Sequence, residues 1–248
     1  MRYLLEVSYN GSAYHGWQVQ KNAISVQEVL NNSLSLKLGV PIETVGSGRT
    51  DKGVHAIQQF AHFDTDRMIN SESILYGLNN FLPKSISVNN ISLISEEAHA
   101  RFNAVSRSYI YKITKKKNPF LSGLSYYYTG KMNIGLMEEG SRILEEETDF
   151  QCFSKIKTDV NHFLCDILKA KWIEKKDEVW FLITADRFLR GMVRAIVGTL
   201  LDLGNEKINL DDFQGILQSK DRKKAGRAAP AYGLYLNEVK YPKKIFLK

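Results

Sequence analysis

Short strand-like segments recur along this chain, and segments with helical spacing separate them. In the first half, strands are predicted at residues 2–9, 58–63 and 86–94. Helices are predicted at 26–38 and 74–78, where apolar residues recur every three or four positions. The order strand–helix–strand–helix–strand is typical of a split, mixed α+β layout.

The second half repeats this pattern. Strands are predicted at 109–113, 179–185 and 234–239, and helices at 136–144, 188–203 and 210–217, of which 188–203 is the longest. Two similar halves that meet near residue 105 favour two subdomains, 1–105 and 106–248, which share one antiparallel sheet flanked by helices. A length of 248 residues suits one large or two small domains, and 44% hydrophobic residues supply a core.

The first helix is marked at both ends. Ser25 and Glu28 have the spacing of a capping box, in which two side chains satisfy backbone donors at a helix N-terminus. Gly39 and Pro41 follow Leu38, the last apolar position, and predict the end of the helix.

Composition predicts a soluble, cytoplasmic protein. No apolar run approaches the length of a membrane span. Residues 1–9 have a strand pattern, not the basic and apolar regions of a signal peptide. Cys152 and Cys165 lie among apolar residues without metal-ligand spacing, so buried free thiols are expected. The five histidines are scattered, and no metal site is predicted.

The net charge of +7 is distributed unevenly. Residues 1–105 hold 8 basic and 9 acidic side chains, whereas residues 106–248 hold 26 and 18. A basic half favours a polyanionic partner, because neutralised phosphates release counterions. Candidate contact segments are 115–117, 222–224 with Arg227, and 243–244. Each cluster alone is better explained by solvated surface lysine, so the asymmetry is the stronger observation.

The segment 46–54 holds three glycines within eight positions, which predicts a tight turn with exposed backbone. It matches neither a P-loop nor a dinucleotide-binding fingerprint, because the required Lys, Ser/Thr and third Gly are missing. Its distinctive residue is Asp51, two positions after Arg49. Composition leaves two interpretations open: a solvated loop, which is the commoner case, or a loop that presents an ionised nucleophile.

Residues 48–56, Gly-Arg-Thr-Asp-Lys-Gly-Val-His-Ala, resemble the signature of the TruA family of tRNA pseudouridine synthases. Other segments resemble further motifs of that family in the same order. They are 9–11, 16–20, 78–79 with 82–83, 99–102, 107–111, 149–150 with 153, 188–189, 192–194 with 197–198, and 233–236. The resemblance covers nearly the whole chain, and the ordered set is far more specific than any single motif.

The resemblance implies an isomerase that converts uridine to pseudouridine at positions 38, 39 and 40 in the anticodon arm of tRNA. The N1–C1′ bond breaks, the uracil turns over, and C5 bonds to C1′, so no cofactor is expected. The implied fold packs two halves around a central sheet with a basic cleft between them, usually as a homodimer. Asp51 is the implied catalytic carboxylate. Three roles are open to it: attack on C1′, addition to C6, or removal of a proton from C2′.

Three more residues have implied roles in the site. Arg194 matches the basic residue that pairs with the catalytic carboxylate and keeps it ionised. Tyr109 matches the tyrosine that stacks on the target base, and Arg49 matches a residue that holds the nucleotide out of the RNA stack. From the residues alone, Arg194 is equally a surface helix residue and Tyr109 equally a core residue beside Tyr111. His55 and His99 are expected in hydrogen-bonded structural roles.

Some positions depart from the family pattern. Arg190 and Gly191 stand where Tyr or His is frequent before the Met, Ala195 replaces a common Asn, and Ala228 replaces a usual Thr. These changes do not alter Asp51. They put the RNA contacts and the helix packing in question, but not the reaction.

Three other functions compete with this one. A basic module that binds folded RNA without modifying it needs only basic charge and tyrosines, and it gains nothing from Asp51. A glycosidase needs two acids that flank one bond, and the matched motifs offer no second carboxylate. A related synthase with another RNA target shares all of the motifs, because target choice depends on the shape of the whole cleft.

Overall fold

The computed structural model describes residues 1–156 and 160–247, and the chain forms two compact units. The first holds Met1–Val105 and the chain from Tyr235 onward, and the second holds Ser106–Leu234. The chain thus leaves the first unit at the residue where the two sequence patterns meet. The second unit ends at Leu234, whereas the predicted division ran from 106 to 248, because the last strand returns to the first unit.

This return changes how charge is distributed. Residues 235–248 hold four lysines and one glutamate, which change the net charge of the first unit from −1 to +2. The second unit keeps 22 basic and 17 acidic side chains, or +5. The second unit remains the more basic, but it does not carry the whole excess.

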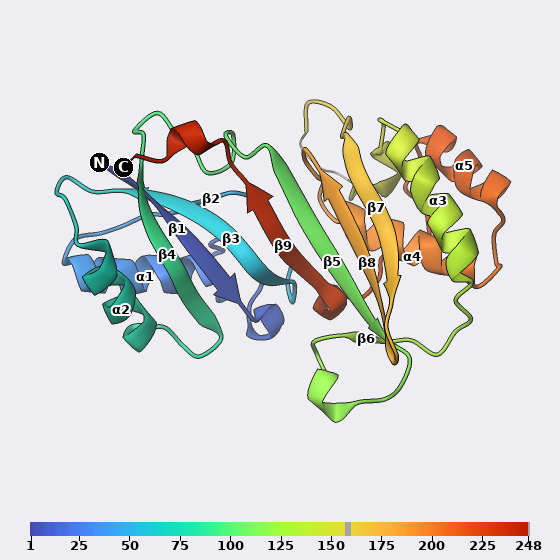
Figure 1. Ribbon diagram of the computed structural model, residues 1–248, viewed down its shortest axis with the longest axis horizontal. Coiled ribbons are helices and arrows are strands. Elements are labelled where there is room, and N and C mark those ends of the chain that lie inside the picture. Colours follow the sequence, from blue (N-terminus) through green and yellow to red (C-terminus); the bar gives the residue numbers. More distant parts are fainter. Residues whose placement is uncertain (157–159, 248) are drawn as a thin grey trace. The chain divides into compact units, whose positions relative to one another are not determined.

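The first unit is a mostly antiparallel sheet covered by two helices (Figure 1). The strand order is β4 (Ile86–Ile94), β1 (Arg2–Tyr9), β3 (His55–Asp64) and β9 (Leu234–Lys240), with short β2 (Val45–Gly46) also on β3. Only β9 runs parallel to its neighbour in this sheet, with His55 opposite Tyr235. The helices are α1 (Val26–Leu38) and α2 (Ser71–Phe81), which contact each other, and α2 packs on β4.

Helix α1 begins and ends at the predicted signals. The Ser25 side chain accepts a hydrogen bond from the Glu28 amide at 3.2 Å, which is one of the two bonds of the predicted capping box. Gly39 ends the helix with a φ of 71°, a left-handed conformation that glycine adopts without a steric penalty. Leu30 and Leu34, on the predicted apolar face, are fully buried.

The second unit also combines a sheet with helices on one side (Figure 1). Strands β5 (Ser106–Thr114), β8 (Glu178–Ala185) and β7 (Ile167–Glu174) form antiparallel pairs, and β6 (Tyr126–Tyr127) adds to β5 in parallel. Helices α3 (Ile134–Glu146), α4 (Met192–Gly204) and α5 (Leu210–Ser219) contact one another, and α3 packs on β7. The mixed α+β class with mostly antiparallel strands is confirmed.

Helix α3 protects the edge strand of this unit. The Glu138 carboxylate accepts from the Trp172 amide at 2.7 Å, and the Glu145 carboxylate accepts from the Ala170 amide at 2.6 Å. The Trp172 indole also donates to the Ser141 hydroxyl at 3.2 Å. Unpaired amides on an edge strand can pair with a strand of another chain. Here the two glutamates accept hydrogen bonds from the amides of Ala170 and Trp172.

The predicted helix 188–203 is shorter than expected. It begins at Met192, because Gly191 before it has a φ of 73°, which no α-helix accommodates. With 13 residues, α4 equals α1 and α3 in length, so the prediction that it is the longest helix was wrong. Cys152 and Cys165 are buried free thiols, as predicted. No helix within the described residues is long and apolar enough to cross a membrane.

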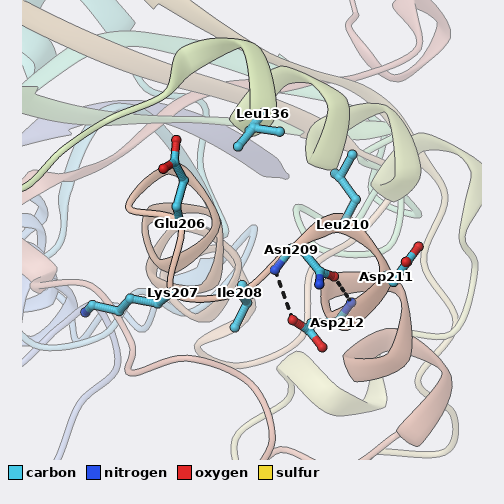
Figure 2. Close-up of a pocket in the computed structure, with 8 residues that line it drawn as sticks. All are labelled: Leu136, Glu206, Lys207, Ile208, Asn209, Leu210, Asp211 and Asp212. Atoms are coloured by element: carbon cyan, nitrogen blue, oxygen red, sulfur yellow. Dashed lines mark hydrogen bonds between the residues drawn. The ribbon is translucent and has the colours of Figure 1, made fainter.

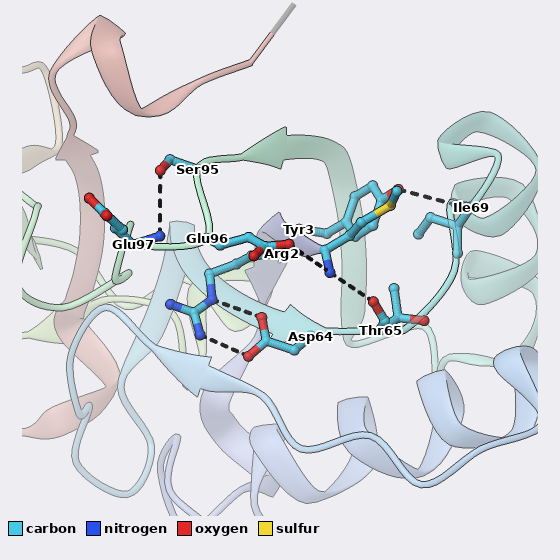
Figure 3. Close-up of polar contacts among 9 residues, drawn as sticks. Arg2, Tyr3, Asp64, Thr65, Ile69, Ser95, Glu96 and Glu97 are labelled. Atoms are coloured by element: carbon cyan, nitrogen blue, oxygen red, sulfur yellow. Dashed lines mark hydrogen bonds and ion pairs between the residues drawn. The ribbon is translucent and has the colours of Figure 1, made fainter.

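Polar contacts fasten the first residues to the ends of β3 and β4 (Figure 3). Arg2 donates two hydrogen bonds of 2.8 Å to the Asp64 carboxylate and a third to the Ala98 carbonyl. The amino group of Met1 donates to the Thr65 carbonyl and lies 3.2 Å from the Glu96 carboxylate. The paired geometry of Arg2 and Asp64 is the strong form of an ion pair.

His62 lies buried beside this cluster and makes stability depend on pH. Its Nδ1 accepts from the Ala100 amide at 3.1 Å, and burial, with Arg2 and His99 nearby, lowers its pKa to about 4. Between pH 6.5 and about pH 4 the unfolded chain binds a proton that the folded chain does not, so stability falls as the pH is lowered. We expect a loss of about 2 kcal/mol between pH 7.5 and pH 5 from this group, measured by urea unfolding.

The asparagine variant His62→Asn keeps an acceptor near the Ala100 amide but cannot titrate. It should flatten the pH dependence in this window, whereas the exposed control His15→Asn should retain the wild-type slope. An unchanged slope in His62→Asn would assign the pH dependence to other groups.

Candidate active site

Asp51 lies in the loop that joins β2 to β3, as the predicted tight turn required. The Val54 amide donates to the Asp51 carbonyl at 3.1 Å and closes a four-residue turn. Gly53, the third residue of that turn, has a φ of 78°, the conformation for which such turns select glycine. Asp51 is half-buried, while Lys52 beside it is exposed.

The residues before and after Asp51 are fixed to the segment 9–17. The Thr50 hydroxyl pairs with that of Tyr9 at 2.8 Å, and the Thr50 carbonyl accepts from the Trp17 amide at 3.3 Å. On the other side, the Gly53 amide donates to the Tyr14 carbonyl at 3.3 Å. Asp51 is therefore a half-buried residue of a turn whose backbone is hydrogen-bonded on both sides.

Two glycines permit this close approach. A Cβ on Gly11 would lie 1.9 Å from the Val54 carbonyl oxygen, and one on Gly16 would lie 2.3 Å from the Thr50 carbonyl oxygen. Gly16 also has a φ of 91°, where other residues are strained. The Asp51 turn is thus supported by the segments 9–11 and 16–20. In the sequence these segments stood out only because they resemble family motifs.

Gln59 is a positioning residue that the sequence did not single out. It is fully buried on β3, its side-chain nitrogen donates to the Gly48 carbonyl at 2.9 Å, and its oxygen accepts from the Ser47 hydroxyl. The Ser47 amide donates to the Phe60 carbonyl at 2.7 Å. The available signal was a polar residue on the buried face of a predicted strand, because such a residue needs internal partners.

Arg49 shares the loop with Asp51 and is exposed. Its Nε donates to the side-chain oxygen of Gln18 at 2.9 Å. This hydrogen bond gives the Arg49 guanidinium a preferred orientation. It also joins Arg49 to Gln18 in the segment 16–20.

His55 and His99 are hydrogen-bonded, as expected. Nδ1 of the buried His55 accepts from the Gly11 amide at 3.1 Å, and its ring stacks on Tyr235 at 4.6 Å. Nδ1 of His99 accepts from the Arg101 amide at 3.0 Å.

Tyr109 and Tyr111, both on β5, have different environments. Tyr111 is fully buried, its hydroxyl donates to the Pro230 carbonyl at 2.8 Å, and burial raises its pKa. Tyr109 is only half-buried, and its ring meets Phe188 edge-on at 5.1 Å. Tyr111 is thus the core residue, and Tyr109 retains exposed surface with which to contact a ligand.

Arg194 occupies the first turn of α4. Its immediate neighbours, Val193 and Ala195, are buried, whereas Arg194 is half-buried. Its Nε donates to the Ala229 carbonyl at 2.7 Å, and the Ala229 amide donates back to the Arg194 carbonyl at 2.9 Å. This reciprocal pair fixes the base of the side chain, so Arg194 is not a loose surface residue.

Two of the residues that depart from the family pattern suit the local packing of α4. Ala195 is 1% exposed, and its carbonyl accepts from the Thr199 hydroxyl at 2.9 Å. Gly191 provides the left-handed residue at which α4 begins. Nothing in the structure explains Ala228.

A surface pocket of about 590 Å³ lies elsewhere in the second unit (Figure 2). It surrounds the start of α5, where Asn209 and Asp212 form a reciprocal capping box. Glu206, Asp211 and Asp212 make its lining acidic, which disfavours a polyanionic ligand. None of the four candidate residues lines it.

The chain matches a family model described as tRNA pseudouridine synthase over residues 6–103 and 143–242. It therefore belongs to the tRNA pseudouridine synthase family, whose members are isomerases. The matched ranges contain Arg49, Asp51 and Arg194, whereas Tyr109 lies outside them.

Individual relatives match almost from end to end. The chain is 44% identical over 246 residues to tRNA pseudouridine synthase A of Parabacteroides distasonis, covering 99% of this chain and 98% of that one. It is 43% identical to the protein of the same name from Bacteroides fragilis, with the same coverage. Identity to the Bacillus subtilis protein is 40%, covering 97% and 99%.

Proposed function

We propose that this protein converts uridine to pseudouridine at positions 38, 39 and 40 of the anticodon arm of tRNA. Family membership supports the reaction class, and the relatives are named for tRNA. The observation that carries the proposal is the Asp51 turn, which lies inside the matched range and holds one half-buried carboxylate on a backbone that is hydrogen-bonded on both sides.

Asp51 is the proposed catalytic group. A carboxylate that attacks C1′, adds to C6 or takes a proton from C2′ must approach the nucleotide in its ionised form. A half-buried position restricts its orientation, and the bonds of Thr50 and Gly53 limit its backbone motion. The reaction gains from such positioning, because reacting atoms held in place lose less entropy on reaching the transition state.

The other three residues have supporting roles in this proposal. Arg49, exposed on the same loop, holds the target nucleotide out of its stack. The half-buried ring of Tyr109 stacks on the uracil. Arg194 supplies the positive charge that pairs with the carboxylate and orients it.

The test uses tRNA transcripts with uridine labelled by tritium at C5. Formation of the C5–C1′ bond releases this label, so release reports the reaction itself. Three transcripts, each with uridine at only one of positions 38, 39 and 40, should all release tritium. Release only from uridines elsewhere would identify a synthase with a different target. No release, with tight tRNA binding, would identify a binding protein.

Affinity for tRNA should depend strongly on salt. The chain carries a net charge of +7, and each phosphate that it neutralises releases counterions. With six or more such contacts, the dissociation constant should rise by about a thousandfold between 50 and 200 mM salt. Filter binding across a salt series measures the slope, and a flat response would contradict a role for the basic segments.

A homodimer is also proposed from the family resemblance, and a cytoplasmic location from the composition of the sequence. Light scattering on the purified protein, with and without tRNA, gives the oligomeric state directly.

A further inference from the structure

A turn in the first unit presents an aromatic ring to solvent. Phe102 is 74% exposed, although large apolar side chains are usually buried. The Arg101 guanidinium lies 5.5 Å from its ring centroid, and the His99 ring lies 4.4 Å from it. The ring is thus supported by a cation and an imidazole while most of its surface remains open.

This turn is held rigidly. The His99 amide donates to the Asn103 side chain at 2.6 Å, and the Asn103 amide donates back to the His99 carbonyl at 3.0 Å. The Ala100 amide donates to the buried His62. Because the turn is already ordered, a ligand that contacts Phe102 loses little affinity to ordering it.

A basic segment lies along the turn. It is the 3-10 helix Lys243–Ile245, which Figure 1 shows beside the loop that leaves β4. The Ser95 amide donates to the Ile245 carbonyl at 2.9 Å, and the Tyr241 hydroxyl donates to the Ala100 carbonyl. The exposed side chains of the two segments form what we call the turn surface: Arg101, Phe102, Lys243 and Lys244.

We propose that the turn surface is a second RNA-binding site, where a base of the tRNA stacks on Phe102 and the cations contact phosphates. An open aromatic ring next to cations is the combination that single-stranded RNA binds. The inference rests on the proposed function, since it takes tRNA as the ligand.

This site is distinct from the Asp51 loop. His62, which supports the turn, follows His55 by seven residues along β3, and His55 comes just after the loop. At about 3.3 Å per strand residue, the two ends lie more than about 20 Å apart. Phe102 therefore stacks on a nucleotide other than the one that reacts.

A second copy of this chain is the competing occupant. A two-fold interface centred on the turn surface would bring Arg101, Lys243 and Lys244 against the same cations of the other copy, which costs free energy. The nearby acids do not offset this, because Glu96 pairs with the Met1 amino group at 3.2 Å and the exposed Glu97 adds one negative charge against three cations. Charge therefore favours RNA.

The test compares tRNA binding by wild type, Phe102→Ala, Phe102→Trp and the double variant Lys243→Gln/Lys244→Gln. Tyr76→Ala is the matched control, because Tyr76 is a 76% exposed aromatic residue on α2 of the same unit. Phe102→Ala should raise the dissociation constant about 5- to 100-fold, and Phe102→Trp should restore binding. The double variant should lower the slope of log affinity against log salt by about two. The control should match wild type.

Each outcome decides between the proposals. Unchanged affinity in Phe102→Ala, with an active wild type, would overturn the second site and leave the proposed function intact. Unchanged affinity with a dimer that dissociates, seen by light scattering, would assign the surface to a second copy. Failure of wild type to bind tRNA would instead overturn the proposed function. Thermal unfolding of Phe102→Ala should match wild type, because the side chain is exposed.

Discussion

Replacing Asp51 with asparagine is expected to abolish tritium release from tRNA uridines while tRNA binding persists. The asparagine side chain keeps the shape of aspartate and removes its charge, so nucleophilic attack and proton removal are both lost. We expect kcat to fall about a thousandfold or more, since single catalytic groups contribute on this scale. Single-turnover assays at saturating enzyme separate this loss from any change in affinity.

A binding protein would behave differently. Its Asp51 would only repel phosphates, so the same variant would bind tRNA as well as or better than wild type, and wild type would release no tritium. Lys52→Gln is the control on the same turn: it removes a neighbouring charge and should leave kcat within a few-fold of wild type. Full activity in Asp51→Asn would exclude Asp51 as the catalytic group.

The second large effect is expected from Gly16→Ala. The new Cβ would lie 2.3 Å from the Thr50 carbonyl oxygen and 3.1 Å from the Asp51 carbonyl carbon, and the φ of 91° adds strain. Because backbone atoms cannot move aside as flexible side chains do, the Asp51 turn must shift. We expect a loss of about 3 kcal/mol in unfolding free energy and at least a tenfold drop in kcat, measured by urea unfolding and tritium release.

Gly39→Ala separates strain from displacement. Gly39 has a similar φ of 71° at the end of α1, but nothing lies within 4 Å of the new Cβ. This control should lose about 1 kcal/mol and keep full activity. If both variants lose stability equally and both remain active, Gly16 does not position the Asp51 turn.

Local patterns predicted strands and helix ends, including one strand whose buried and exposed side chains do not alternate regularly. The strand 86–94 has the predicted bounds, and Gly39 ends α1 as expected. Strand β7 was missed because Leu168 is 62% exposed while the small residue Ala170 is buried, where the pairing with β8 shifts register between Ile167 and Lys169. This irregularity interrupts the alternation of buried and exposed residues on which the prediction depends.

The candidate site was predicted unevenly for a related reason. Asp51 and its turn follow from glycine spacing, which is a local signal. The supports of the turn do not, because Tyr9, Gly16 and Gln59 reach it from separate segments of the chain. The distinction between Tyr109 and Tyr111 likewise depends on the tertiary contacts of Pro230 and Phe188, which alternation along one strand cannot report.

The return of β9 to the first unit has a consequence for synthesis on the ribosome. Tyr235 stacks on His55, and the Val239 amide donates to Gln58 across 181 residues of chain, so β3 lacks these partners until residues 234–240 emerge. Contacts this distant in sequence form late, after the nearby elements have assembled. The nascent chain therefore carries Asp51 long before β3, the strand that follows the Asp51 loop, has all of its contacts. The enzyme becomes competent only near the end of its own translation.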